Sequence, residues 1–369
     1  ATMAPALARR GQRSDVAYLL DREGFQDDLV KAGIGVHPVL HSSRPARVRA
    51  LRRLIVDVQP DLVHTTLFEA DLTGRVAARL AGVPVVSSLV NVPYGPEHLG
   101  AEGLRSWKVR AAQAADLATG RLVTRFHAIS DHVRTVMSAR LRIAPSRIDV
   151  VPRGRDPESL GTRSAERRRR VRAGLDLPVD VPVLLSVARH EYQKGLDVAV
   201  EAMAEVARVY PNAVYVVAGR EGNLTPTITS IAARHRLEGS VRLLGPRTDV
   251  ADLLAAADVF IGPSRWEGLG SAAVEAMGAR TPIVLSDVAA LREAVGSDES
   301  ALLVAPDDPA ALAVGLIECL KDPSAATMRA EHARARFDER FTLDRVVEQM
   351  ESFYRRAVNG ATPGPNAGK

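Results

Sequence analysis

Cysteine is almost absent from this chain, and aromatic residues are scarce. Cys319 is the only cysteine among 369 residues, so the chain cannot form an internal disulfide. No Cys/His spacing typical of zinc is present, which excludes disulfide scaffolds and zinc modules and favours a reducing, cytoplasmic compartment. Aromatic residues make up 4% of the chain, so aliphatic residues must form the cores, and we interpret Cys319 as one small core residue.

Long apolar runs and a strong charge excess are also lacking. No stretch is long enough to span a membrane, and no signal peptide is visible. The first residues, ATMAPALARRG, read as the end of a helix, so we expect a fragment or a truncated chain. The net charge of +5 is compatible with anionic metabolites or lipids and equally with simple solubility. We expect no nucleic-acid partner.

Short apolar runs alternate with helical patterns along most of the chain. This alternation predicts parallel sheets covered by helices on both faces, an α/β fold of two Rossmann-like doubly wound domains. Strands are expected at Val16–Leu20, Val36–Leu40, Leu62–His64, Val83–Leu89, Leu122–Ile129, Val183–Val187, Ala213–Ala218, Val241–Leu244, Val259–Ile261, Ile283–Leu285 and Ala301–Val304.

A break in the pattern separates the two domains. The predicted domains are 1–155 and 156–340, followed by a helix over 341–358 that returns to the first domain and a disordered tail over 359–369. The charge block Glu166–Arg172 is interpreted as a solvated helix face rather than a polyanion site.

Phe260–Asp287 is the segment richest in chemistry, and it reads as strand, loop, helix and strand. Its glycines allow a ligand to approach the backbone, and free N–H groups at the helix start favour phosphate. One carboxylate lies in the loop and another on the helix, where it can accept hydrogen bonds from a vicinal diol. The candidate residues are Glu267, Gly268, Leu269, Gly270, Ser271 and Glu275.

This segment resembles the signature E-G-F-G-x-x-x-x-E-A-M-A-x-G-x-P-V-V of the retaining family 4 glycosyltransferases, which have the GT-B fold. The resemblance implies that Glu267 lies by the donor sugar and that Glu275 binds the ribose hydroxyls. The segment VLLSVARHEYQKG resembles the family element VGRLxxxKG, so Arg189 and Lys194 are expected to bind the diphosphate.

Weaker resemblances extend over the rest of the chain. The segment VVAGREG resembles the family turn lvGdGp, in which Gly219 matches, and Arg247 and Val250 are expected in a loop that meets the nucleobase. On the acceptor side, Asn91 stands where the family often has a histidine, and Ser130 aligns with a family serine. The segment DVVPRGRD matches the family motif IPNGvD, with Gly154 and Asp156 aligned. The family's first strand and its Gly-rich loop are expected to be missing.

The resemblance implies a retaining, metal-independent hexosyl transfer from a UDP- or GDP-linked sugar to a hydroxyl acceptor. Glu267, Arg189 and Lys194 are its expected catalytic residues, and no cofactor or metal is expected. The acceptor is a glycan, lipid or small molecule, in cell-envelope, polysaccharide, glycolipid or metabolite glycosylation. A nucleotide-sugar epimerase of the same fold and a non-catalytic binding protein remain as alternatives.

The stretch Pro45–Val58 has an apolar face, with arginines on the rest of its surface. We interpret it first as a helix that packs on the core and has a solvated arginine face. Peripheral contact with the inner face of an anionic membrane is the alternative. The arginines are Arg44, Arg47, Arg49, Arg52 and Arg53.

Overall fold

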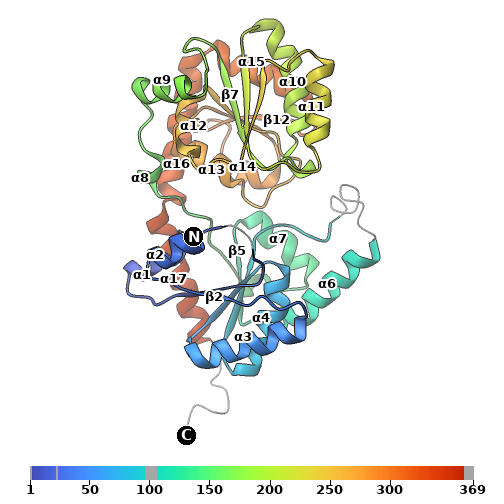
Figure 1. The fold of residues 1–369 in the computed structure, drawn as a ribbon, viewed down its shortest axis with the longest axis vertical. Helices are drawn as coiled ribbons and strands as arrows, with labels where there is room; N and C mark the ends of the chain where they lie inside the picture. The colour runs from blue at the N-terminus through green and yellow to red at the C-terminus, as the bar shows by residue number, and fades with distance from the viewer. Residues whose placement is uncertain (1, 22–23, 96–105, 361–369) are drawn as a thin grey trace. The chain divides into compact units, whose positions relative to one another are not determined.

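The computed structural model describes residues 2–21, 24–95 and 106–360, and the chain divides into two compact units. The first unit comprises Ala1–Gly154 with Leu343–Lys369, and the second comprises Arg155–Thr342. The predicted disordered tail falls almost entirely on 361–369, outside the described residues. Each unit contains parallel strands and surrounding helices (Figure 1).

The first unit holds two parallel sheets. Strands β1 (Asp15–Tyr18) and β2 (Gly35–Pro38) form one, and the other has the order β3 (Val63–Thr66), β4 (Val85–Leu89), β5 (Arg125–Ala128) and β6 (Ile148–Val150). The described helical elements are α1 (Met3–Arg9), α2 (Gln26–Lys31), α3 (Arg44–Val58), α4 (Phe68–Ala81), α6 (Ser106–Gly120), α7 (Asp131–Arg140), the 3₁₀ turn η1 (Pro145–Arg147) and α17 (Leu343–Asn359).

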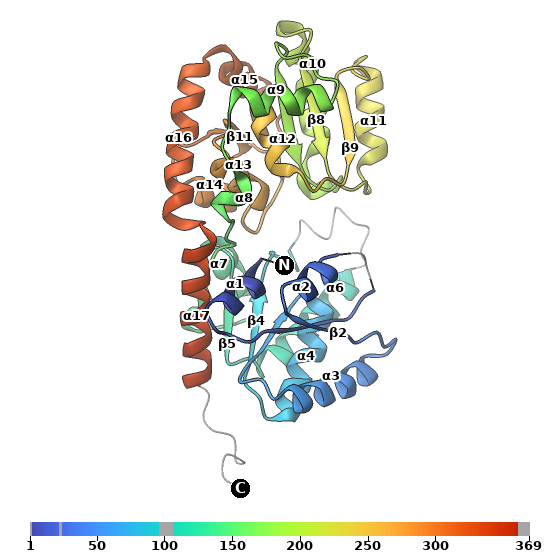
Figure 2. The same cartoon turned by 60° about the vertical axis from the view of Figure 1, so that its left-hand side comes forward.

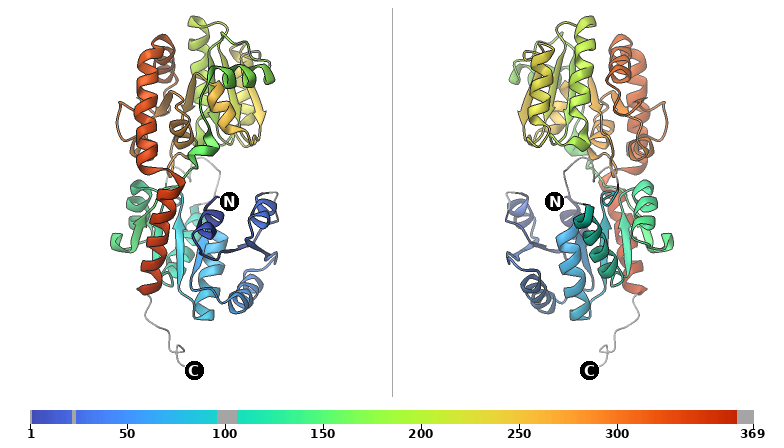
Figure 3. Two further views of the ribbon diagram at one scale, coloured as in Figure 1. Left: turned by 90° about the vertical axis from the view of Figure 1, so that its left-hand side faces the viewer. Right: turned by 90° about the vertical axis from the view of Figure 1, so that its right-hand side faces the viewer.

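Successive residues of β4 face opposite sides of the four-stranded sheet, as the strand geometry requires. Val85 packs with Leu51 of α3 and Ala78 of α4. Val86 packs instead against Val346 and other residues of α17. Helices therefore cover both faces of this sheet, and Figure 3 lets the reader follow α17 along one side and α3 and α4 along the other.

A chain of hydrogen bonds joins α17 to three strands. Tyr354 OH lies 2.8 Å from His64 Nδ1, and His64 Nε2 lies 2.6 Å from Ser88 Oγ. Ser88 Oγ lies 2.8 Å from His127 Nδ1, and His127 Nε2 lies 2.7 Å from the Val151 carbonyl oxygen. The carbonyl can only accept, so His127 Nε2 donates and the remaining proton positions follow: Ser88 donates to His127, His64 to Ser88, and Tyr354 to His64.

The second unit holds one six-stranded sheet in the order β12 (Leu302–Val304), β11 (Ile283–Ser286), β10 (Val259–Gly262), β7 (Val183–Val187), β8 (Val214–Ala218) and β9 (Val241–Gly245). Its described helical elements are α8 (Pro157–Leu160), α9 (Ala165–Gly174), η2 (Tyr192–Lys194), α10 (Leu196–Val209), α11 (Thr225–Arg234), α12 (Val250–Ala256), α13 (Ser271–Gly278), α14 (Ala289–Val295), α15 (Pro309–Lys321) and α16 (Pro323–Arg340).

The strand order of this sheet reverses between β7 and β10. The chain moves outward from β7 through β8 to β9, returns to the other side of β7 at β10, and continues through β11 to β12. All of these neighbours are parallel, so the loops after β7 and β10 leave the same edge of the sheet side by side. Ligands of doubly wound sheets bind at this topological switch point. Figure 2 shows the strands of this unit with α10 and α11 close by.

The prediction that the charged face of α9 is solvated is wrong for one of its arginines. Arg172 is fully buried, and its guanidinium donates to the Ala256 carbonyl at 3.0 Å and to Asp258 Oδ2 at 2.7 Å. Arg168 reaches the other oxygen of Asp258 at 2.5 Å. A long arginine side chain can reach an internal partner, and a run of charged residues in the sequence does not show whether a given arginine is buried or exposed.

Candidate functional site

The loops that follow β7 and β10 bring two predicted catalytic residues together. Lys194 Nζ lies 2.5 Å from Glu267 Oε1, and the side chains are 21% and 11% exposed. Lys194 ends the 3₁₀ turn η2 after β7, and Glu267 lies in the loop after β10. The pair therefore spans the topological switch point of the sheet.

Contacts between the two loops hold this pair in place. Ser264 Oγ donates to Glu267 Oε1 at 2.9 Å, and the Arg265 N–H donates to the Gln193 carbonyl at 2.8 Å. Gly195 has a φ of 60°, and a Cβ there would overlap the Pro263 carbonyl oxygen. Only glycine tolerates both the left-handed backbone and this close approach, so the residue after Lys194 must be glycine.

Arg189 is the more accessible of the two predicted cations. Its side chain is 56% exposed, and its nearest acidic partner is Glu191, at 3.7 Å. The loop that carries Arg189 is held by the loop after β8, because the His190 N–H donates to the Arg220 carbonyl at 3.0 Å. Gly219 allows this packing, since a Cβ there would overlap the Ala188 carbonyl oxygen. Arg189 is thus an exposed guanidinium on a fixed backbone.

The predicted helix start at Ser271 is where α13 begins. Gly270 caps this helix with a φ of 82°, so the N–H groups of the first turn have no side-chain cap. Gly268 and Leu269 are buried in the loop before it. Glu275 lies on the second turn, and its Oε1 accepts a hydrogen bond from Arg155 Nε at 2.5 Å. Sequence reasoning missed this partner.

Arg247 and Val250 do not share the loop in which they were expected. Val250 is the first residue of α12, whereas Arg247 lies in the preceding loop. The Arg247 guanidinium binds both oxygens of Asp249, at 2.8 Å and 2.5 Å. This hydrogen bonding lowers the pKa of Asp249. Because Asp249 occupies the Arg247 guanidinium, a nucleobase at this loop would be bound by backbone groups.

The predicted acceptor-side residues lie in the first unit and do not form one cluster in the contacts described. Asn91 follows β4, and its Oδ1 accepts from the Val92 N–H at 2.9 Å. Ser130 is 1% exposed, and its Oγ caps α7 by accepting from the Val133 N–H at 3.1 Å. Ser130 therefore has little surface to offer an acceptor, and its functional role stays a prediction.

The loop after β4 is anchored to a buried charge cluster. Tyr94 OH donates to Asp116 Oδ2 at 2.9 Å, and Asp116 Oδ1 lies 2.5 Å from NH1 of the fully buried Arg75. The Arg75 guanidinium also donates to Ser87 Oγ of β4 at 2.8 Å. These contacts fix the loop that carries Asn91.

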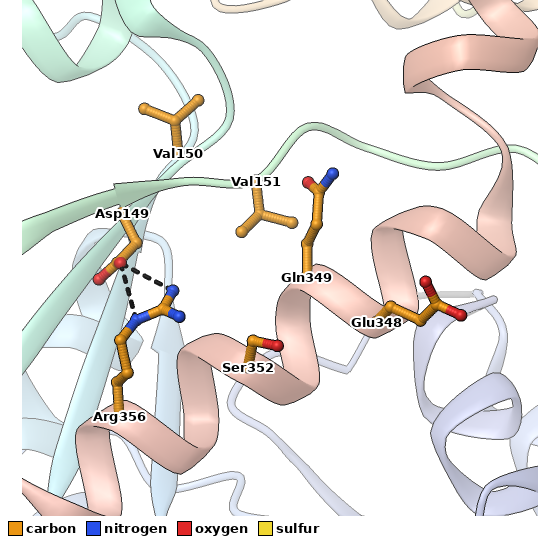
Figure 4. A pocket seen from close by; sticks show the side chains of 7 residues that line it. All are labelled: Asp149, Val150, Val151, Glu348, Gln349, Ser352 and Arg356. Carbon is orange, nitrogen blue, oxygen red and sulfur yellow. Dashed lines mark hydrogen bonds and ion pairs between the residues drawn. The ribbon is translucent and has the colours of Figure 1, made fainter.

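A cavity of about 270 Å³ lies between β6 and α17, away from every predicted site residue. Figure 4 shows Arg356 of α17 reaching Asp149 of β6, and their closest atoms are 2.9 Å apart. Arg125 holds the other oxygen of Asp149 at 2.7 Å. The charged lining is thus largely occupied in attaching α17 to the sheet. The full lining is Asp149, Val150, Val151, Glu348, Gln349, Ser352 and Arg356.

Helix α3 packs its apolar face inward, as expected. Leu51 and Ile55 are buried, and they join the core formed with α4. Arg44 and Arg47 both reach Glu69, whereas Arg49 and Arg53 are exposed. Across the described ranges 2–21, 24–95 and 106–360, we find no helix with the length and apolar character needed to cross a membrane.

Comparison with known families gives two matches that together cover most of the chain. Residues 1–159 match the family described as Glycosyltransferase Family 4. Residues 167–336 match the family described as Glycosyl transferases group 1. The first match lies mainly in the first unit and the second match lies in the second unit.

Individual relatives agree with these matches. The chain is 33% identical over 319 residues to D-inositol 3-phosphate glycosyltransferase of Kineococcus radiotolerans, with 81% of this chain and 72% of the relative covered. It is 30% identical over 305 residues to glycogen synthase of Mycobacterium tuberculosis, with 82% and 70% covered. Anabaena Alr3699/HepE, solved in complex with UDP and glucose, has a TM-score of 0.85 at 21% identity, covering 96% of this chain and 94% of that one. This likeness confirms the predicted fold class.

Proposed function

Because this chain belongs to the family 4 glycosyltransferases of GT-B fold, we propose that its donor site lies at the β7/β10 switch point of the second unit. Glycosyl transfer from a nucleotide sugar is the activity of the chain, and neither the epimerase nor the non-catalytic alternative is favoured. The observation that carries the site assignment is the ion pair between Lys194 and Glu267 across the switch point.

In this proposal, Lys194 and Arg189 bind the diphosphate of the donor. Breaking the bond between sugar and phosphate leaves negative charge on the diphosphate, and fixed cations stabilise that charge in the transition state. An ammonium has further N–H donors, so Lys194 can keep Glu267 and still donate to phosphate. The free N–H groups at the start of α13 supply a further anion site.

Glu267 then orients the donor sugar. Its Oε1 accepts from Lys194 and Ser264, and among the described residues no partner is bound to Oε2. That oxygen is suited to accept a hydrogen bond from a sugar hydroxyl. We propose retention by attack on the same face of the sugar, in which the departing phosphate helps to remove the acceptor proton. The scheme needs no strong protein base, no metal and no cofactor.

Calorimetry with UDP and with GDP tests the donor site. We expect one of the two to bind, and Glu275→Ala to weaken that binding by roughly 1–3 kcal/mol, because the ribose hydroxyls lose a charged acceptor. Absence of binding by both nucleotides would contradict the donor-site proposal. Unchanged affinity of the Glu275→Ala variant would contradict the ribose assignment alone.

The acceptor side is proposed to involve the loop after β4, which carries Asn91. Its amide can hydrogen-bond a sugar or lipid hydroxyl without acting as a base. The tie from Tyr94 to the Asp116 carboxylate supports a fixed loop at this place. The acceptor itself is a glycan, a lipid or a small molecule that carries a hydroxyl.

If the acceptor is a lipid, we propose that α3 contacts the membrane surface peripherally. The exposed arginines Arg49, Arg52 and Arg53 would attract anionic headgroups. We expect co-sedimentation with vesicles that contain anionic lipid, and its loss in a variant with these three arginines replaced by glutamine. A chain that stays in the supernatant with anionic vesicles at low salt would contradict membrane contact and leave the donor site unaffected.

A further inference from the structure

An arginine from the segment that leaves the first unit holds the predicted ribose ligand. Arg155 Nε donates to Glu275 Oε1 at 2.5 Å, and the two side chains are 24% and 20% exposed. Oε2 of Glu275 has no hydrogen-bond partner within the described parts of the chain. The carboxylate is thus fixed through one oxygen and open through the other.

The backbone of Arg155 is fixed as well. Its N–H donates to the Phe341 carbonyl at 2.8 Å, and the residue forms a parallel bridge with Thr342. The following residue, Asp156, caps α8 by accepting from the Glu158 N–H at 3.0 Å. With the chain held on both sides, the guanidinium loses less conformational entropy when it binds Glu275.

The residue type at this position is also informative. The family motif IPNGvD has an apolar residue where this chain has Arg155 between Gly154 and Asp156. An arginine there supplies a charge-assisted hydrogen bond, which is stronger and more directional than a contact between neutral groups. A carboxylate also accepts several hydrogen bonds at once, so Arg155 and a ligand hydroxyl can bind Glu275 together.

We propose that Arg155 is a positioning residue for Glu275, and that it sharpens the preference of the donor site for ribonucleotides over deoxyribonucleotides. The inference rests on the proposed donor site. Glu275 accepts hydrogen bonds from the ribose diol through Oε2, while Arg155 prevents the carboxylate from rotating away. Removal of Arg155 leaves Glu275 present but mobile, so the ribose contact weakens while contacts to diphosphate and base remain.

The test compares the nucleoside diphosphate that binds, UDP or GDP, with its 2′-deoxy analogue in calorimetry of the full chain. We expect the parent protein to bind the ribonucleotide about 10-fold or more tightly than the analogue. Glu275→Ala and Arg155→Met should each reduce this ratio to nearly 1, and the Kd of the deoxy analogue should rise less than that of the ribonucleotide, because the analogue keeps only the 3′-hydroxyl as a partner for Glu275. Arg155→Lys should restore part of the ratio, and it also serves if Arg155→Met does not fold.

Arg234→Met is the matched control, because it removes an exposed arginine of the same unit that pairs with Glu201 on α10. The Arg234→Met variant should prefer the ribonucleotide over the deoxy analogue by the same factor as the parent protein. If Arg155→Met keeps the ratio while Glu275→Ala loses it, the donor site stands and the Arg155 inference is overturned. If Arg155→Met tightens both nucleotides, Arg155 is a competitor and the inference is again overturned. A ratio unaffected by Glu275→Ala would overturn the ribose assignment itself.

Discussion

Replacing Lys194 with methionine is expected to lower kcat for sugar transfer by roughly 10²–10³-fold, since removing one preorganised group that stabilises transition-state charge has an effect of this size. Lys194 is 21% exposed and is fixed by Glu267 at 2.5 Å, so its charge is in place before the reaction begins. The measurement is the initial rate of transfer at saturating donor, together with the Kd of the nucleotide.

The same substitution leaves the Glu267 carboxylate, 11% exposed, without its cation. An unpaired charge at a partly buried position destabilises a fold, so a loss of activity could reflect unfolding. The double variant Lys194→Met/Glu267→Gln removes both charges and should recover thermal stability but not activity. Lys321→Met, at the exposed end of α15, is the matched control and should keep the parent rate. A Lys194→Met protein within a few-fold of the parent kcat would refute the proposed role of Lys194.

The elements around the donor site could be predicted because their local sequence signals are strong. Small apolar runs gave the central strands, and the glycines before Ser271 marked the start of α13, which begins at that residue. The short strand β6 was missed, because three residues after a 3₁₀ turn are too few to display a period. The expectation that a first strand is missing stays a prediction.

The pairings within the site could not be derived from local sequence. Lys194 and Glu267 are 73 positions apart, and they meet because β10 returns beside β7. The family resemblance placed both residues in one site but did not imply that they contact each other. Arg155 and Glu275 are 120 positions apart, and no periodic pattern links them. Such contacts depend on strand order and on where the chain leaves the sheet, which composition and spacing do not encode.

Burial could not be derived from residue type either. Arg172 lies in a run of charged residues that favours solvent, yet its guanidinium satisfies several backbone carbonyls inside the second unit. His64 and His127 carry no motif that announces a buried chain of hydrogen bonds. Their positions on β3 and β5 place them on either side of Ser88, and this follows from the order of the parallel strands.

The two buried histidines, His64 and His127, are expected to lower the stability of the first unit in acid. Burial, together with a smaller contribution from the nearby His127, lowers the pKa of His64 to about 3. Burial also lowers the pKa of His127 to about 4. Both values lie below the ordinary value of 6.5, so the unfolded chain binds more protons than the folded chain between these values.

The sign of the effect follows from this difference in bound protons. The contribution of each histidine to stability is fully present above its unfolded pKa and is lost as the pH falls toward the folded pKa. Within that window, each histidine should lower the free energy of unfolding by about 1.4 kcal/mol for every pH unit of acidification. Asp71 acts in the opposite direction, because burial raises its pKa to about 6 and the folded chain then takes up a proton first. The total slope therefore mixes opposing groups.

A variant isolates one histidine from this mixture. His64→Gln keeps an amide that can donate and accept but cannot titrate, so Asp71 and His127 contribute equally to both proteins. The stability advantage of the parent protein over His64→Gln should shrink by about 1.4 kcal/mol per pH unit as the pH falls from about 6 to about 4. Urea unfolding of both proteins across this range measures the difference.

Tyr354→Phe provides the control for this comparison. It removes the hydroxyl that donates to His64 Nδ1 at 2.8 Å but leaves both histidines in place. Its stability should be lower by about 1–3 kcal/mol near neutral pH, because a buried acceptor loses its partner. Its dependence on pH should still resemble that of the parent more than that of His64→Gln. If the parent and His64→Gln lose stability in parallel as the pH falls, His64 is already charged or exposed in the fold, and the proton order assigned to this chain of hydrogen bonds is wrong.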